Sequence, residues 1–221
     1  VAAGRTDTGV HATGQIVGFH TDAPRQLEAW RRGVNSLTSA ALKVRWVAEV
    51  AEEFHARYSA TARRYMYIWY EDGVESPVVH GLAVRSAALD DDKMHRGAQA
   101  LLGEHDFTSF RGAGCQSASA QRCVHRVTVR RFAGLVVLDV TANAFLLHMV
   151  RNIAGAIVQV GLGKRAVGWP GELLAAHDRT ELGPTAPAHG LYLVDVRYPD
   201  YDFPKAPLPG LLRAVGDPAR F

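Results

Sequence analysis

Residues 127–142 read VTVRRFAGLVVLDVTA, with Ala133–Gly134 between two runs rich in valine and leucine. Two β-favouring runs separated by a two-residue turn that contains glycine predict a β-hairpin over 127–132 and 135–142. A hairpin pairs its strands antiparallel, whereas parallel strands need a long crossover connection. The hairpin therefore favours a fold built on an antiparallel sheet.

Outside the hairpin, short β-like runs and helical spacings of apolar residues alternate irregularly along the chain. Strands are expected at 14–20, 43–50, 63–70 and 191–198, and helices at 26–37, 90–102, 144–162 and 169–177. The prolines from Pro199 onward predict an extended tail. Irregular alternation favours an α+β fold over a doubly wound parallel one, with a domain boundary expected in the polar segment 54–61.

Arginine greatly outnumbers lysine among the basic residues of this chain. Its 221 residues, enough for one or two domains, carry 25 Lys+Arg against 22 Asp+Glu, a net charge of +3. Only four of the 25 cations are lysine, so arginine supplies 21. The arginine guanidinium donates hydrogen bonds in a fork that fits phosphate and carboxylate. The composition therefore allows a nucleic-acid partner without demonstrating one.

The two cysteines, Cys115 and Cys123, are too few for a disulfide scaffold and lack the Cys-x-x-Cys spacing of zinc sites. Reduced thiols are typical of the cytoplasm, which is the expected location. The most apolar stretch, 144–163, contains His148 and Arg151, so it indicates a buried core helix rather than a membrane span. We therefore expect neither a membrane nor a metal among the partners.

The densest polar motif is GRTDTGVHA at 4–12, where two glycines bracket a loop that carries one carboxylate, Asp7. Glycines at such places permit positive φ or the close approach of a ligand. One interpretation is a surface turn in which Asp7 bonds the local backbone; the other is a catalytic aspartate presented on a loop. An aspartic protease is disfavoured because it needs two such carboxylates, and the chain has no second Asp-Thr-Gly or Asp-Ser-Gly triplet.

Three further segments combine arginines with aromatic or apolar residues. At 54–67 arginines are interleaved with aromatics such as Tyr65, a pattern that suits either stacking on a base or half-buried sheet positions. Arg151 lies on a largely apolar helix, so it either reaches solvent at the helix edge or is buried against an anion, for which Asp7 is a candidate. Arg111 and the arginines after it suit a phosphate-contacting surface or a solvated basic face.

Taken together, these motifs resemble the tRNA pseudouridine synthase A family. The matching blocks, in the family's order, are GRTDTGVHATGQ (4–15), HARYSATARRYMY (55–67), FTSFR (107–111), NAFLLHMVRNIAG (143–155) and APAHGLYL (186–193). The chain departs from the family at Thr8, where alanine is common, and at Leu147–His148, where a histidine pair is common. The resemblance implies an isomerase that converts uridine to pseudouridine at positions 38, 39 and 40 in the tRNA anticodon stem-loop.

For the fold, the resemblance implies two ferredoxin-like, RNA-binding-like subdomains that form a largely antiparallel sheet, with helices on one side and a central active-site cleft. It implies an N-terminal subdomain over 1–57, lacking a strand and a helix ahead of the catalytic loop, and a C-terminal subdomain over 58–221. A homodimer and no cofactor are also implied. The alternative is a non-catalytic RNA-binding module that keeps the fold.

For the site, the resemblance implies Asp7 as the catalytic nucleophile and Arg151 as the cation beside it. A carboxylate in this reaction can attack the sugar, form an ion pair with it, or remove a proton from C2′. Tyr65 is expected to hold the target base. Further substrate-binding residues are expected to be Arg5, His11, Arg63 and Arg111. Because the target lies in a helical stem, its nucleotide must flip out of the stack.

Overall fold

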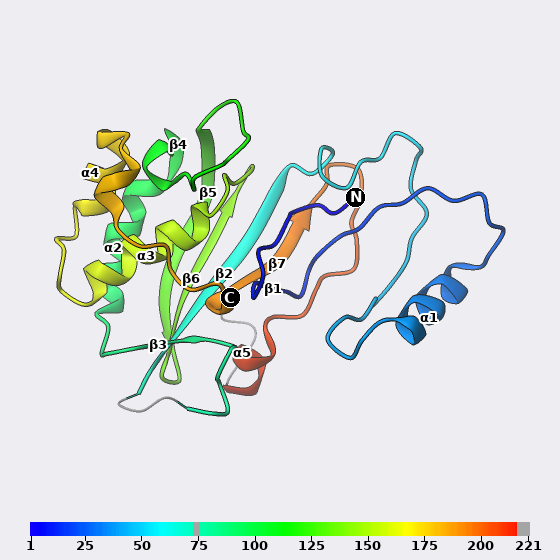
Figure 1. Cartoon of the computed structure of the whole chain (residues 1–221), viewed down its shortest axis with the longest axis horizontal. Helices are drawn as coiled ribbons and strands as arrows, with labels where there is room; N and C mark the ends of the chain where they lie inside the picture. The colour runs from blue at the N-terminus through cyan, green and yellow to red at the C-terminus, as the bar shows by residue number, and fades with distance from the viewer. Residues whose placement is uncertain (73–75, 216–221) are drawn as a thin grey trace.

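The computed structural model describes residues 1–72 and 76–215, and in this part of the chain one mixed sheet organises the fold (Figure 1). The strands are β1 (His11–Ala12), β2 (Ala62–Glu71), β3 (Val84–Ser86), β4 (Gly103–Asp106), β5 (Gln121–Phe132), β6 (Leu135–Ala142) and β7 (Leu191–Arg197). Their order is β1-β7-β2-β6-β5-β4, with β3 beside β2. The pairs β2–β6, β2–β7, β4–β5 and β5–β6 are antiparallel, while β1–β7 and β2–β3 are parallel. The α+β class with a largely antiparallel sheet is therefore confirmed.

The β5–β6 hairpin that the sequence predicts is present. Its turn residues Ala133 and Gly134 both have positive φ, 45° and 84°. Positive φ at both central positions is the type I′ pattern, whose twist matches that of the two strands it connects. The hairpin sets β6 beside β2, so it places the longest strands at the centre of the sheet.

The helices are α1 (Leu27–Leu37), α2 (Asp91–Ala98), α3 (Met149–Gly161), α4 (Trp169–Ala176) and α5 (Gly210–Val215), with short 3₁₀ turns that include η2 (Thr108–Phe110). The first four confirm predicted helices. Asp90 caps α2 by accepting a hydrogen bond from the backbone N–H of Lys93 at 2.9 Å. The helix α5 lies in the segment for which the prolines predict an extended tail, and that part of the prediction is wrong.

Successive residues of β2 serve opposite faces of the sheet. Tyr67 and Trp69 belong to the large core beneath α2, α3 and α4, whereas Met66 and Ile68 belong to a smaller cluster that includes Leu212 of α5. Figure 1 shows α2, α3 and α4 gathered on one side, far from α1. The expectation that all helices lie on one side of the sheet is therefore wrong for α5, which packs against the opposite face.

Two predicted strands are absent. Segment 14–20 contributes only an isolated bridge between Val17 and Ala2, and 43–50 has no ladder at all. Trp46 in the second segment stacks on the ring of Phe203 at 5.0 Å instead. Alternation of apolar residues indicates a half-buried extended segment, but a strand also needs a neighbouring backbone to pair with. Segment 14–20 has only the short stretch of residues 1–3 beside it, and 43–50 pairs with no strand among the described residues.

The helix predicted from residue 144 begins five residues later. The side-chain oxygen of Asn143 accepts hydrogen bonds from the backbone N–H groups of Ala144 (2.7 Å) and Cys123 (3.0 Å), which anchors the chain to β5. His148 then adopts a left-handed conformation, φ 59° and ψ 3°, which a helix cannot contain. The apolar pattern does run through 144–148, but local side-chain bonding replaces the first helical turn.

No helix in the described part of the chain is long and apolar enough to cross a membrane. Both cysteines are free thiols.

Candidate active site

The loop that carries Asp7 is closed by hydrogen bonds across its base. The side chain of Gln15 donates to the Gly4 carbonyl at 2.7 Å and accepts from the Gly4 N–H at 3.3 Å. Within the loop, the Val10 N–H donates to the Asp7 carbonyl at 3.0 Å, and Gly9 takes φ 85°. The two glycines of the motif therefore serve the turn itself, as the pattern predicts.

After the loop, the chain runs along β7 at very short range. The two residues of β1 pair with Tyr192 and Leu193, and the N–H groups of Thr13 and Gly14 donate to the Leu193 carbonyl. A Cβ on Gly14 would lie 2.4 Å from the Val194 carbonyl oxygen, so only glycine fits there. This contact holds the Asp7 loop against the end of the sheet.

Asp7 and Arg151 meet, although 144 positions separate them in the sequence. The Arg151 Nη1 donates to the Asp7 Oδ2 at 2.7 Å, and the Arg151 Nε donates to the carbonyl of Ala186 at 2.8 Å. The side chains are 16% and 32% exposed. Partial burial excludes much of the water that would otherwise screen this ion pair, and the charge-assisted hydrogen bond strengthens it. The predicted pairing is confirmed, and Arg151 is not a solvated helix-edge residue.

His148 is a second partner of the same carboxylate oxygen that sequence reasoning missed. Its Nε2 lies 3.2 Å from the Asp7 Oδ2. His148 lies three positions before Arg151, the spacing that would put two side chains on one face of the helix predicted over 144–162. That spacing was the available signal. The left-handed backbone of His148, which turns the ring toward Asp7, cannot be read from the sequence.

Tyr65 lies beside the Asp7 loop and is only 8% exposed. Burial raises the pKa of Tyr65 to about 12, opposed by the charge of Arg63 and supported by that of Asp7. Phe145 presents its ring to Tyr65 edge to face, with centroids 5.0 Å apart, and a Cβ on Gly4 would lie 3.2 Å from the Tyr65 hydroxyl. The tyrosine is therefore neutral near pH 7 and held by packing on several sides.

Arg63, expected to bind substrate, is engaged by the protein's own backbone. Its guanidinium donates to the carbonyls of Ala60 (2.9 Å), Asn143 (3.1 Å), Ala3 (3.4 Å) and Arg57. Burial lowers the pKa of Arg63. In this structure Arg63 ties the start of the catalytic loop to β2 and to the segment before α3, and its donors are not presented to a ligand.

Of the remaining predicted binding residues, His11 and Arg111 are engaged by other parts of the protein, and Arg5 is not. His11 stacks on Tyr192 with centroids 4.7 Å apart, and its Nε2 lies 2.7 Å from the Gly81 carbonyl. Arg111 donates to the carbonyls of Cys115 and Ser117, both at 2.7 Å. Arg5 is exposed and makes none of the described hydrogen bonds or ion pairs, so it is the one of these side chains that is open to a ligand.

The described residues contain no group of three or more His, Cys, Asp or Glu side chains that could hold a metal ion. The groups gathered at Asp7 are a carboxylate with one guanidinium and one imidazole near the same oxygen, beside a buried tyrosine.

A carboxylate on a loop, a buried cation and an aromatic ring on an antiparallel sheet are the features on which the resemblance rests, and comparison with known proteins supports it. Residues 98–199 match the sequence model of the family described as tRNA pseudouridine synthase. The fold and site thus define a protein of the tRNA pseudouridine synthase class.

Relatives that match most of the chain identify a particular family within this class. Over 208 residues, 93% of this chain and 80% of each relative, the chain is 52% identical to tRNA pseudouridine synthase A of Shewanella sp. (strain W3-18-1) and of Shewanella baltica (strain OS185). It is 51% identical over the same shares to the protein of that name from Shewanella sp. (strain MR-4). The chain belongs to the tRNA pseudouridine synthase A family, which isomerises uridine to pseudouridine in tRNA.

Proposed function

We propose that this chain isomerises uridine to pseudouridine at positions 38, 39 and 40 of the tRNA anticodon stem-loop, with Asp7 as the nucleophile. The observation that carries the proposal is the 2.7 Å contact between Asp7 and Arg151, beside buried Tyr65, in a member of this family. A loop carboxylate that accepts a hydrogen bond from a partly buried guanidinium is held in one place, as a nucleophile must be.

The proposed reaction exchanges one bond at C1′ for another. A lone pair of the Asp7 carboxylate forms an O–C1′ bond while the C1′–N1 bond breaks, and that electron pair leaves on uracil. The uracil turns, its C5 attacks C1′, and the O–C1′ bond breaks with its pair returning to the carboxylate. Loss of the C5 proton and protonation of N1 complete pseudouridine. No atom is gained or lost overall, so the substrate and product are isomers.

Each neighbour of Asp7 has a role in this scheme. Arg151 balances the carboxylate charge before attack and after release. In this scheme Tyr65 contacts the flipped base, and its hydroxyl, neutral at physiological pH, can donate or relay a proton near C5. Flipping exposes the target nucleotide, which otherwise is stacked and paired in the stem. Arg5, exposed two residues before Asp7, is placed to meet the RNA backbone.

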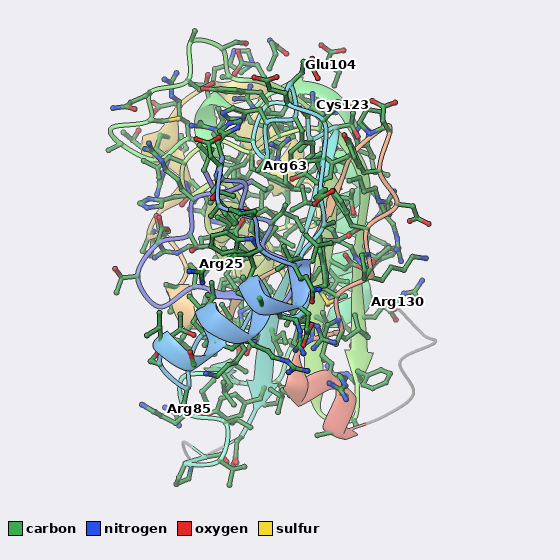
Figure 2. All side chains as sticks on the ribbon, turned by 90° about the vertical axis from the view of Figure 1, so that its right-hand side faces the viewer. Arg25, Arg63, Arg85, Glu104, Cys123 and Arg130 are labelled. Carbon is green, nitrogen blue, oxygen red and sulfur yellow. The ribbon has the colours of Figure 1, made fainter. Side chains whose placement is uncertain are left out.

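We propose further that residues 1–57 and 58–221 are two ferredoxin-like subdomains with the active-site cleft between them, and that the enzyme is a cytoplasmic homodimer that uses no cofactor. In support, Asp7 comes from the first segment, whereas Tyr65 and Arg151 come from the second. Exposed arginines come from several parts of the chain: Figure 2 labels Arg25 before α1, Arg85 on β3 and Arg130 on β5. Exposed guanidinium groups suit contacts with the phosphates of tRNA.

Tritium release tests the proposed reaction. Because the new bond replaces the C5–H bond, tRNA carrying tritium at C5 of uridine must lose that label to water during turnover. The purified chain should release tritium from a tRNA with uridine at 38–40, and much less from the same tRNA with cytidine there. Binding of tRNA with no release would overturn the proposal and favour the non-catalytic RNA-binding module.

A further inference from the structure

The two oxygens of the Asp7 carboxylate have different surroundings. The Oδ2 accepts a hydrogen bond from the Arg151 Nη1 at 2.7 Å, and the His148 Nε2 lies 3.2 Å from the same oxygen. Among the described residues, the Oδ1 accepts no hydrogen bond. One oxygen is thus hydrogen-bonded by Arg151 and in contact with the imidazole, whereas the other is not engaged in this way.

His148 reaches Asp7 through an unfavourable backbone conformation. It is one of three non-glycine residues with positive φ among the described residues. A left-handed conformation is strained for a non-glycine residue. His148 precedes the first residue of α3, yet its side chain makes no hydrogen bond that caps the helix. The imidazole therefore does not cap the helix, as a side chain at this position often does, and instead contacts a carboxylate that is distant in the sequence.

The other side of the imidazole is closed by a glycine. A Cβ on Gly112 would lie 2.8 Å from the His148 Nδ1 and 2.9 Å from the Leu147 carbonyl oxygen, to which the Gly112 N–H donates at 2.8 Å. The loop after Gly112 is in turn held by Arg111, which donates to the carbonyls of Cys115 and Ser117. The ring is thus placed between a loop backbone on one side and the nucleophile on the other.

We propose that His148 is a positioning residue that fixes the Asp7 Oδ2 together with Arg151, so that Oδ1 is the oxygen that attacks C1′. This inference rests on the proposed function of Asp7. With Oδ2 hydrogen-bonded by Arg151 and in contact with the imidazole, rotation of the carboxylate about its Cβ–Cγ bond is restricted, and Oδ1 stays free of hydrogen bonds from the described residues. Gly112 and Arg111 support the ring from behind, which gives Arg111 a place in the site without contact with RNA.

The variant His148→Gly separates this role from a structural one. Glycine adopts the left-handed conformation without penalty, so the backbone stays intact and the melting temperature should stay equal or rise. The imidazole contact is lost and the carboxylate can leave its productive orientation, so kcat should fall about 10- to 100-fold. The KM for tRNA should change less than about threefold. Added imidazole should restore part of the lost kcat.

His177→Gly is the matched control, because His177 also has positive φ, 50°, but follows α4 and is exposed. It should show the same stability change with no loss of kcat. An unchanged kcat in His148→Gly overturns the inference, as does a loss that accompanies a lower melting temperature and that imidazole does not restore. A complex with a tRNA substrate analogue in which C1′ lies closer to Oδ2 than to Oδ1 also overturns it.

The outcome for Asp7→Asn distinguishes this inference from the proposed function. If Asp7→Asn retains turnover in a preparation whose wild type is active, the nucleophile assignment fails, and the role of His148 fails with it. If Asp7→Asn is inactive and His148→Gly turns over like the wild type, only the positioning role is wrong.

Discussion

Helices α3 and α1 show how differently two regions of this chain are stabilised. Ten residues of α3 are buried, whereas no residue of α1 is. The contrast extends to the segments around them: within 1–61 only Ala3, Gly14 and Ala56 are buried. Arg151 therefore projects from a well-packed helix, while Asp7 belongs to a region with little buried apolar surface.

This difference shows that Arg151 and Asp7 are held in place by different kinds of interaction. Apolar packing holds Arg151, since every turn of α3 contributes to the core beneath it. Specific polar contacts hold Asp7: the Gln15 side chain, the Arg63 guanidinium on the Ala3 carbonyl and Arg151 itself. The position of the Asp7 loop is thus expected to depend on a few hydrogen bonds. The packing of the core is not expected to depend on any one of these hydrogen bonds.

The largest expected effect separates function from folding in the weakly packed region. Asp7→Asn removes the proposed nucleophile but keeps the size of the side chain, so turnover should fall on the order of 10³-fold or more while tRNA binding stays within a few-fold. Tritium release and tRNA binding measure the two quantities. Asp195→Asn, at a carboxylate whose partner is the exposed Arg197, is the control and should leave turnover unchanged. Turnover near the wild-type rate in Asp7→Asn would remove Asp7 from the mechanism.

The packing contrast itself is tested by a pair of truncations. Ile153→Ala in α3, at a side chain with no exposed surface, should lower the free energy of unfolding by about 2–5 kcal/mol. Leu27→Ala in α1, at a side chain 38% exposed, should lower it by less than about 0.5 kcal/mol. Urea unfolding measures both. Equal losses would show that α1 is packed as tightly as α3, contrary to the comparison.

Arg151→Lys tests whether the contact between the two regions needs a guanidinium or only a charge. Arg151 donates in two directions, to Asp7 and to the Ala186 carbonyl, and an ammonium cannot reproduce that fork. We expect kcat to fall about 10- to 100-fold, as for the loss of one charged hydrogen bond. Arg165→Lys, beside Trp169 at the far end of α3, should leave kcat unchanged. Full activity in Arg151→Lys would show that charge alone suffices.

A smaller effect is expected from pH at Tyr65, where the two regions meet. Its pKa is about 12 in the folded chain, against 10.0 for the ordinary group, so folding favours the neutral phenol. This contribution is complete below pH 10 and is lost as the pH rises from 10 to 12, a change of about 2–3 kcal/mol. Tyr65→Phe cannot ionise, so its stability should decline less than that of the wild type over this range.

Denaturant unfolding between pH 9 and 12 measures that difference. Tyr192 and Tyr198, whose pKa values burial also raises, are present in both proteins and cancel in the comparison. Tyr58→Phe, at a tyrosine 76% exposed, should follow the wild type. Parallel curves for the wild type and Tyr65→Phe would show that Tyr65 is open to water in solution.

Local patterns account for most of what the sequence predicts correctly. The hairpin at Ala133–Gly134, the cap of α2 at Asp90 and the glycine-bracketed loop of Asp7 depend on neighbouring residues alone. The Asp7–Arg151 pair is also predictable, because a partly buried guanidinium requires an anion. The predicted strand at 43–50 fails because a strand needs a partner, and the sequence of one segment does not say whether another lies beside it.

The sequence by itself therefore determined the fold class, the central strands, the nucleophile candidate and its cation. Only the tertiary structure decided which side chains the site can spare for a ligand: Arg63 is occupied by backbone carbonyls, His11 stacks on Tyr192, and His148 turns to Asp7. The physical reason is the distance along the sequence between the interacting residues. Periodicity, turns and caps are set within a few residues, whereas the partner of a polar side chain is set by whichever distant backbone or carboxylate the packed fold brings within about 3 Å.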